Sequence, residues 1–357
     1  MIQIAEPDVG MEEQDRITEV LDSGMLADGP PVREFEETFA AFCGTAHSVA
    51  TSNGTTALHA GLEAIGIGEG DLVLTSPFSF VASANAIRLA GAEPVFADID
   101  PETYTLDPAA AREKLRQHEG DIDAILVVHL YGLPADMDEF VEITENHDLA
   151  LIEDAAQAHG AAVDGERVGS IGDIGCFSFY PTKNMTTGEG GMVVTDDPDI
   201  ADRAARFINH GRTGDGKHAE VGHNFRMTSV AGAIGLAQLE KLPSNTETRR
   251  RNASMLTEGL ADSSVTTPVE PPRRHHVYHQ YTVRYEDREQ LQETLDEHDI
   301  GYGVYYPRPI HKEQAYADVD VSTPAAERAA QEVLSLPVHP GVSKSDIGHI
   351  LEVFDNV

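Results

Sequence analysis

The chain has 357 residues, with 61 acidic and 25 basic side chains and a formal net charge of −36. A surface this negative repels nucleic acid and anionic lipid, so neither is an expected partner. No run approaches the roughly 18 continuous apolar residues of a membrane span, and the N-terminus lacks the basic and apolar regions of a secretory signal. We therefore expect a cytoplasmic protein.

Two further features of the composition bear on cysteine chemistry and on adaptation to salt. Cys43 and Cys176 are the only cysteines, so we expect no disulfide framework and no cysteine metal site. Acidic residues are spread along the whole chain, lysine is scarce and tryptophan is absent. These features favour a halophilic protein, adapted to molar salt in which a short Debye length screens self-repulsion, over an ordinary acidic enzyme.

Short apolar strands alternate with helical stretches between about residues 45 and 195, the pattern of an α/β layer fold. The candidate strands are His47–Thr51, Asp71–Thr75, Glu93–Ala97, Ala124–His129, Ala150–Glu153, Ile174–Phe179 and Gly191–Thr195. The helices between the first five strands are expected near residues 55–65, 80–90, 108–117 and 136–147. After Glu153 the alternation stops and residues 161–178 read as consecutive strands, which predicts a mixed sheet.

The rest of the chain predicts further helices and then a change of character. Helices are expected near residues 198–209 and 227–241, followed by a long helix around the arginines at 249–251. From about residue 265 three prolines mark a break, and the segments after it are a strand at 277–285 and helices near 288–298, 324–333 and 344–354. We expect a large domain at residues 1–245, with an N-terminal arm at 1–24, and a small α+β domain at 246–357.

Lys183 is the most informative residue of the chain. It follows the apolar run Cys176–Tyr180 and a Pro-Thr bend, and it precedes the glycine-rich turn Gly188–Gly191. Desolvation at such a place lowers the pKa of an amine and makes it a nucleophile toward carbonyls. On this local pattern alone, a solvated surface lysine remains the alternative.

Two strand ends carry polar groups that suit a ligand. Gly54, Thr55 and Thr56 join the first strand to the first helix, where free backbone N–H groups suit a phosphate, although threonine also serves as a plain N-cap. Asp154 ends an apolar strand at the edge of the sheet where α/β proteins bind ligands. Capping of the following helix is the alternative role for this carboxylate.

Other sequence patterns resemble known ligand sites but lack residues that those sites need. Residues 211–218 nearly match a P-loop, but His218 stands where Ser or Thr is needed and the segment follows a helix, so we expect a mobile surface loop. The histidines of residues 275–279 have no matching carboxylate or cysteine cluster, so we expect a strand with solvent-facing histidines and no metal. Alternation would place His276 on the opposite face from His275 and His279. No GxGxxG joins a strand to a helix, so a nicotinamide cofactor is not expected.

Taken together, these elements resemble the fold-type I pyridoxal-phosphate enzymes and, more narrowly, the DegT/DnrJ/StrS family of sugar aminotransferases. The similar blocks run through nearly the whole chain and include SNGTTALHAGL at 52–62, GDLVLTSPFSFVAS at 70–83, IEDAAQAHGA at 152–161, CFSFYPTKNMTTGEGGMV at 176–193 and GHNFRMTSVAGAIGLAQL at 222–239. The resemblance implies an α/β fold with a mixed, mostly parallel sheet flanked by helices, and pyridoxal 5′-phosphate in the large domain.

The resemblance also implies a role for each site residue. Lys183 would bind the cofactor aldehyde and later act as general base, and Asp154 would keep the pyridine nitrogen protonated. The other implied cofactor contacts are Gln157 at the ring's 3-oxygen, Phe80 on the ring face, and Gly54, Thr55, Thr56 and Ser178 at the phosphate. The residues implied at the edges of the site are Asn224, reaching the cofactor of the neighbouring subunit in a homodimer with shared active sites, and Tyr306 and His311, approaching the sugar.

The implied reaction moves an amino group from an amino acid, most simply L-glutamate, to a keto-sugar on a nucleotide carrier, for amino-sugar and surface-glycan synthesis. Relatives that dehydrate sugars carry histidine at the position of Lys183, so dehydration is disfavoured here. Two alternatives remain: an aminotransferase acting on a keto-cyclitol or another non-nucleotide ketone, and a cofactor-binding regulator without turnover.

Overall fold

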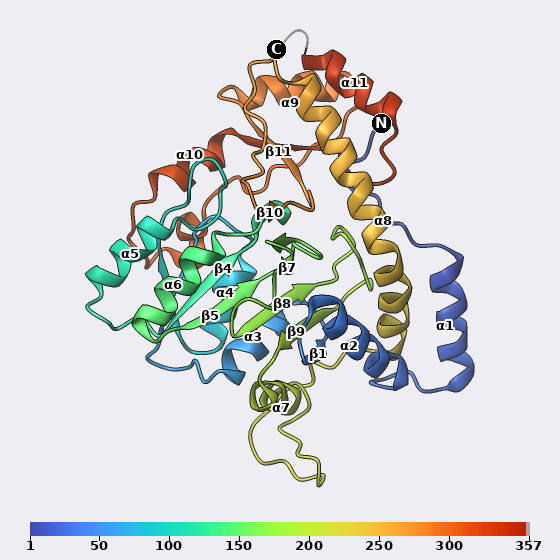
Figure 1. Ribbon diagram of the computed structural model, residues 1–357, viewed down its shortest axis with the longest axis vertical. Coiled ribbons are helices and arrows are strands. Elements are labelled where there is room, and N and C mark those ends of the chain that lie inside the picture. Colours follow the sequence, from blue (N-terminus) through green and yellow to red (C-terminus); the bar gives the residue numbers. More distant parts are fainter. Residues whose placement is uncertain (355–357) are drawn as a thin grey trace.

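The computed structural model describes residues 1–354. Its centre is a seven-stranded sheet with the strand order β1-β9-β8-β5-β4-β2-β3 (Figure 1). The strands of this sheet are β1 His47–Thr51, β2 Leu72–Thr75, β3 Glu93–Phe96, β4 Ala124–Val128, β5 Ala150–Asp154, β8 Ile174–Ser178 and β9 Gly191–Thr195. The seven strands predicted between residues 45 and 195 are confirmed to within one residue at each end.

The sheet is mixed, as predicted, but for a different reason. Strands β3, β2, β4, β5 and β8 run parallel, and β9 pairs antiparallel with both β8 and β1. Residues 161–178 do form the consecutive strands predicted there, but only the last of these strands belongs to the main sheet. Strands β6 (Ala162–Val163) and β7 (Glu166–Arg167) form a separate small sheet with β10 (Arg274–His275), and β8 re-enters the main sheet parallel to β5.

Helices cover both faces of the sheet. They are α1 Met11–Ser23, α2 Pro30–Cys43, α3 Gly54–Ala64, α4 Ala82–Leu89, α5 Pro108–Gln117, α6 Met137–His147, α7 Pro198–Phe207, α8 Ser229–Gly259, α9 Arg288–Glu297, α10 Pro324–Glu332 and α11 Lys344–Phe354. Side chains alternate between the faces of a strand, so Leu126 and Val128 of β4 pack with α3 and α4, while Ile125 and Val127 pack with α5 and α6. Helices α2 and α8 cover the β8–β9 end of this second face.

Helix α8 links the sheet to the C-terminal unit (Figure 1). It is one helix of 31 residues, so the expectation of two helices, near 227–241 and around 249–251, was wrong. Its first half packs on α1 and α2, and its last turns place Ala253 and Leu256 in the core of the C-terminal unit. There β11 (Tyr281–Arg284) pairs antiparallel with β12 (Val333–Leu336). The expected domain boundary at residue 245 therefore falls within a continuous helix.

The strand expected at residues 277–285 begins only at Tyr281. Residues 276–280 are irregular because their backbone is bonded to a loop of the large unit: the Val277 N–H donates to the Gly132 carbonyl at 3.0 Å. His276 and His279 are 2% and 6% exposed, so the expectation of solvent-facing histidines was wrong for both. By contrast, residues 211–218 form an exposed turn after α7, in line with the surface loop expected there.

A buried carboxylate docks the N-terminal helix α1 on α8. Glu13 is fully buried, and its side chain lies 2.8 Å from Lys241 Nζ and accepts a hydrogen bond from Gln238 Nε2 at 2.7 Å. The Gly10 N–H donates to the same carboxylate at 2.7 Å. Burial acts to raise the pKa of Glu13, but these hydrogen bonds outweigh it and lower the pKa to about 2.

Replacement of Glu13 by Gln should lower the free energy of unfolding by about 2 kcal/mol at neutral pH, because it breaks a buried, hydrogen-bonded ion pair. A carboxylate with a depressed folded-state pKa stabilises above its unfolded-state value of 4.5, and this stabilisation is lost as pH falls toward about 2. The difference between wild type and variant should therefore shrink over that range in urea denaturation.

Glu12→Gln is the matched control. Glu12 also contacts Lys241, at 2.9 Å, but its side chain is 71% exposed, so its loss should cost less than about 0.5 kcal/mol. Equal losses in the two variants would contradict the role of burial.

Candidate active site

A cavity of about 730 Å³ lies where the parallel strands β4, β5 and β8 end. Their last residues, Val128, Asp154 and Ser178, all line it, because the carboxyl ends of parallel strands meet at one edge of a sheet. The predicted site residues that line this cavity are Gly54, Thr55, Thr56, Phe80, Asp154, Gln157, Ser178, Lys183 and Tyr306. Residues separated by up to 252 positions in the chain are thus brought to one place.

The N-terminus of α3 forms one wall of the cavity. Asn53 caps this helix by accepting the Thr56 N–H at 2.9 Å, and the Thr56 hydroxyl accepts the Asn53 N–H at 3.1 Å. The first-turn N–H groups of Gly54 and Thr55 have no intrahelical acceptor, so they are open to an anion in the cavity. A side chain at position 54 would place its Cβ 2.6 Å from the Ser178 Cβ, so glycine is required for this close approach. The wall fits a phosphate group.

Asp154 is a buried carboxylate that also lines the cavity. The Ser83 hydroxyl donates to its Oδ2 at 2.7 Å, and the Ala156 N–H donates to its Oδ1 at 3.2 Å. Burial raises the pKa of Asp154, and these hydrogen bonds oppose the rise. A protonated ring nitrogen beside Asp154 would be the opposite charge that stabilises this buried carboxylate.

The neighbouring residue holds the end of β5 in place. Glu153 is fully buried, and its carboxylate accepts the backbone N–H groups of Gly169, Ile171 and Gly172 at 2.7–2.8 Å. His129 Nε2 lies 2.9 Å from the same carboxylate, while its Nδ1 accepts the Ala135 N–H at 3.0 Å. Because Nδ1 is an acceptor, Nε2 carries the proton and donates to Glu153.

Lys183 reaches the cavity from the turn that follows β8. Its own N–H donates to the Tyr180 carbonyl at 2.9 Å, and the Thr186 hydroxyl donates to the Phe179 carbonyl at 2.9 Å, which closes the turn. Desolvation lowers the pKa of the Lys183 amine to about 8, although the charge of Asp154 acts to raise it. A substantial share of the amine is therefore neutral near pH 8, as a nucleophile must be.

Gln157 and two aromatic residues form the remaining wall. The Gln157 side chain accepts the Tyr131 N–H at 2.7 Å and donates to the Tyr306 hydroxyl at 3.1 Å, so the orientation of its amide is set. Phe80 is 57% exposed at the mouth, with its ring centre 6.0 Å from that of Tyr306.

Two predicted site residues lie outside this cavity. Asn224 is exposed, and its backbone forms an antiparallel β-bridge with Asn209. The contact of Asn224 with the cofactor of a neighbouring subunit stays a prediction. His311 is 4% exposed, and its Nε2 lies 3.3 Å from Glu327 and 3.5 Å from the Thr323 hydroxyl. His311 does not line the cavity in this structure, and its predicted contact with the sugar stays a prediction.

Other residues of the lining were missed. They are Ser83, Tyr180, Thr182, Glu189, His279, Gln280 and Tyr305, among others. Four of them, Ser83, Tyr180, Thr182 and Glu189, lay inside blocks that carried the resemblance but were not assigned a role. His279 belonged to the histidine run assigned to solvent, and only the irregular path of residues 276–280 turns it inward.

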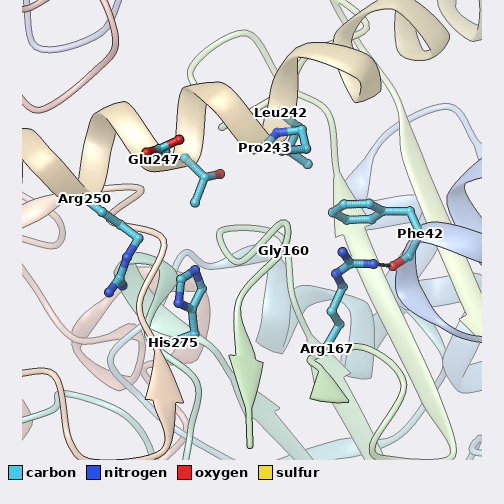
Figure 2. A pocket seen from close by; sticks show the side chains of 9 residues that line it. Phe42, Gly160, Arg167, Leu242, Pro243, Glu247, Arg250 and His275 are labelled. Carbon is cyan, nitrogen blue, oxygen red and sulfur yellow. Dashed lines mark hydrogen bonds between the residues drawn. The ribbon is translucent and has the colours of Figure 1, made fainter. Parts of the chain in front are cut away.

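A second hollow, of about 340 Å³, lies between α8 and the small β6–β7–β10 sheet (Figure 2). Its cationic side chains are already engaged: Arg250 donates to Glu270 at 2.6 Å, and Arg167 lies over the Phe42 ring at 4.0 Å and donates to the Phe42 carbonyl. None of the predicted site residues lines it.

Within residues 1–354 no three His, Cys, Asp or Glu side chains gather as metal ligands. None of the helices described in that range combines the length and the apolar character of a membrane span.

The lowered pKa of Lys183 can be measured directly on the cofactor-free protein. Acylation of Lys183 at a series of pH values, followed by peptide mass spectrometry, should give a midpoint near pH 8, because the buried amine loses its proton more easily. The exposed Lys344 in the same molecule reports the reactivity of the reagent itself. A midpoint near the ordinary lysine value of 10.5 would rule out a desolvated amine.

Comparison with known proteins agrees with this geometry. The model of the DegT/DnrJ/EryC1/StrS aminotransferase family matches residues 7–355. The chain is 38% identical to a pleiotropic regulatory protein of Geobacillus stearothermophilus and 38% identical to a UDP-N-acetyl-3-dehydro-alpha-D-glucosamine 3-aminotransferase of Acidithiobacillus ferrooxidans, in each case over 94% of this chain and 91% of the relative.

Its fold superposes on the crystal structure of S. venezuelae DesV in complex with a ketimine intermediate with a TM-score of 0.93, at 38% identity, covering 96% of this chain and 93% of that one. The N-terminus of α3, the buried Asp154 and the Lys183 amine also suit the phosphate, ring nitrogen and aldehyde of pyridoxal phosphate. The chain therefore belongs to the DegT/DnrJ/EryC1/StrS family and is a pyridoxal-phosphate-dependent aminotransferase of fold type I.

Proposed function

We propose that this aminotransferase moves an amino group from an amino acid, L-glutamate in the simplest case, to a keto-sugar carried on a nucleotide. The observation that carries the proposal is the pairing, in one cavity, of an amine whose pKa is lowered to about 8 with a buried carboxylate and an anion-binding helix end. The relative from A. ferrooxidans, which acts on a UDP-linked sugar by its name, supports the substrate class.

In this proposal each residue holds one part of the cofactor. The N–H groups of Gly54 and Thr55 and the Ser178 hydroxyl would bind the phosphate, with Thr56 fixing the turn through its cap. Asp154 would keep the ring nitrogen protonated. Phe80 would cover the ring, and the Gln157 amide would donate to the ring oxygen. When bound, pyridoxal phosphate supplies an aldehyde for amines and a ring that accepts electron density from the substrate's α-carbon.

Lys183 has two roles in this proposal. Its neutral Nζ would hold the aldehyde of pyridoxal phosphate while no substrate is bound. Once an amino acid has taken its place, the free Nζ would be the base that accepts and returns the proton of the α-carbon. Both substrates use the same cavity in turn, so the kinetics are ping-pong.

We also propose a homodimer with shared active sites, in which Asn224 of one subunit contacts the cofactor phosphate of its partner. The exposure of Asn224, and of the apolar side chains of Val221 at 91% and Phe80 at 57%, supports contact with a partner subunit. In each subunit of this dimer, the large domain would comprise residues 1–245 and the small domain residues 246–357, and α8 would join them. A cytoplasmic, salt-adapted setting is part of the same proposal and rests on the composition.

The regulator without turnover is the second candidate, because one relative is named as a pleiotropic regulatory protein. Incubation of the purified protein with pyridoxal phosphate, glutamate and either a nucleotide-linked keto-sugar or a keto-cyclitol separates the possibilities. Release of 2-oxoglutarate with the nucleotide-linked ketone, and its loss in Lys183→Ala, is the expected result. Release only with the cyclitol contradicts the substrate class, and no release with any ketone supports the regulator.

Replacement of Asp154 by Asn should separate cofactor attachment from turnover. The amide keeps the shape of the side chain but cannot hold a proton on the ring nitrogen, so transfer should fall by about 100-fold or more. Borohydride should still fix the cofactor to Lys183.

Asp148→Asn makes the same chemical change at an exposed site that precedes β5. Asp148 has φ 55°, a conformation that asparagine also adopts, so activity should be unchanged. Normal turnover in Asp154→Asn would show that the ring nitrogen does not depend on this carboxylate.

A further inference from the structure

Two buried serines lie four residues apart where the chain enters α4. Ser79 precedes the helix and Ser83 belongs to its first turn, and their exposed fractions are 3% and 1%. The Ser79 hydroxyl donates to Ser83 Oγ at 3.0 Å, and the Ser83 hydroxyl donates to Asp154 Oδ2 at 2.7 Å. The two hydroxyls, called the serine pair below, thus form a continuous chain of hydrogen bonds that ends on the Asp154 carboxylate.

The geometry sets the direction of this chain. Each hydroxyl has one proton to donate. The Ser83 proton has two acceptors within reach, the Phe80 carbonyl at 3.3 Å and Asp154 at 2.7 Å, and the closer, ionisable acceptor forms the stronger bond. Since the Ser83 proton is committed to Asp154, only Ser79 can be the donor between the two hydroxyls. A hydroxyl that accepts a hydrogen bond becomes a better donor, so Ser79 strengthens the bond from Ser83 to Asp154.

Asp154 depends on few donors for its charge. Within residues 1–354 its carboxylate accepts hydrogen bonds from the Ser83 hydroxyl and from the Ala156 N–H, the latter at 3.2 Å. Burial raises the pKa of Asp154, which favours the neutral carboxyl, and the bond from Ser83 acts against this rise. Because the two donors reach different oxygens, they also fix the rotation of the carboxylate plane.

We propose that Ser83, supported by Ser79, is a positioning residue for Asp154: the serine pair keeps this carboxylate ionised and oriented, so that the proton shared with the cofactor's ring nitrogen stays on the nitrogen. The proposal rests on the role proposed for Asp154, and it does not depend on which ketone is aminated. A carboxyl that loses the Ser83 bond is more basic and draws that proton toward itself, which weakens the ring as an acceptor of electron density.

Other ionisable groups near Asp154 are left in place by a substitution at position 83. They are Lys183, His129, Glu153, Cys176, Tyr306 and Glu189, the other carboxylate of the cavity lining. Burial raises the pKa of Cys176 and of Tyr306, so both are uncharged near neutral pH. A change in the titration of Asp154 can therefore be assigned to the serine pair.

The first test is the titration of Asp154 in the full-length, cofactor-free protein. Carbon-13 NMR of protein labelled at the aspartate Cγ follows the carboxylates, and the Asp154 signal is the one missing from Asp154→Asn. Ser83→Ala should raise the Asp154 midpoint by about one pH unit, because a hydrogen bond to a charged group is lost. The Ser83 N–H bond to the Phe80 carbonyl, at 3.2 Å, is retained in this variant, so the turn is kept.

Three further variants control for structure. Ser83→Thr keeps the hydroxyl and should stay within about 0.3 units of wild type, whereas Ser83→Val has the same shape without it and should shift like Ser83→Ala. Ser76→Ala is the matched control: Ser76 is also 1% exposed, but its hydroxyl oxygen accepts the Phe78 N–H at 3.0 Å, so the Asp154 midpoint should not change. An unchanged midpoint in Ser83→Ala overturns the proposal. If Ser83→Ala does not fold, as judged by circular dichroism, equal midpoints in the Thr and Val variants overturn it instead.

The part assigned to Ser79 has its own variant. Ser79→Ala leaves the Ser83 hydroxyl in place and removes only its polarisation, so the Asp154 midpoint should rise by a smaller amount, roughly 0.2 units. No rise in Ser79→Ala would show that Ser83 acts alone.

The second test reads the ring nitrogen itself. Pyridoxal phosphate labelled with nitrogen-15 in the ring is added to the wild type and to Ser83→Ala, and the chemical shift of the ring nitrogen should move toward the neutral-pyridine value in the variant. An unchanged shift would show that the serine pair affects Asp154 but not the cofactor, against the proposal. A neutral ring nitrogen in the wild type contradicts the role proposed for Asp154, and the midpoint shift in the cofactor-free protein then still reports the Ser83 bond.

Discussion

The site depends on one constraint, a carboxylate at the buried end of β5 that forms no salt bridge among residues 1–354, although the charge of Lys183 acts on it. Asp154 has the Ser83 hydroxyl and one backbone N–H as hydrogen-bond donors, and burial raises its pKa. The next residue toward the N-terminus, Glu153, is tied to three backbone N–H groups and His129, so the strand end cannot shift to relieve Asp154. A cation in the cavity relieves the cost of that burial, and a protonated pyridine is such a cation.

The cavity as a whole also has few positively charged side chains. Of its lining residues among residues 1–354, Lys183 is the one lysine or arginine, while the molecule carries a net charge of −36. Within this chain, a phosphate at the N-terminus of α3 would thus meet backbone N–H groups and a helix dipole instead of arginine. A nucleotide-linked substrate is itself anionic, so its approach to this surface is repulsive at low ionic strength and eased by salt.

Local pattern predicted much of this molecule. Segments of four to six residues with an apolar centre marked every strand of the main sheet, and Lys183 stood out because an aromatic strand and a glycine turn flank it. The failures came where distant partners decide the structure. Val277 and His279 follow a strand-like alternation, but hydrogen bonds to Gly132 and Asn184 hold them in an irregular segment. The β6–β7 hairpin left the main sheet because β10, more than 100 residues later, pairs with it.

The sequence by itself determined the α/β class, the strands, the candidate lysine and aspartate, and the family. Each of these depends on short contiguous segments of the chain, which can be recognised without knowing their distant contacts. Tertiary structure alone decided that His279 faces the cavity while His311 does not, that Ser83 donates to Asp154, and that Glu13 docks α1 on α8. The physical reason is that burial, and with it the pKa of each group, is set by contacts between segments far apart in the chain.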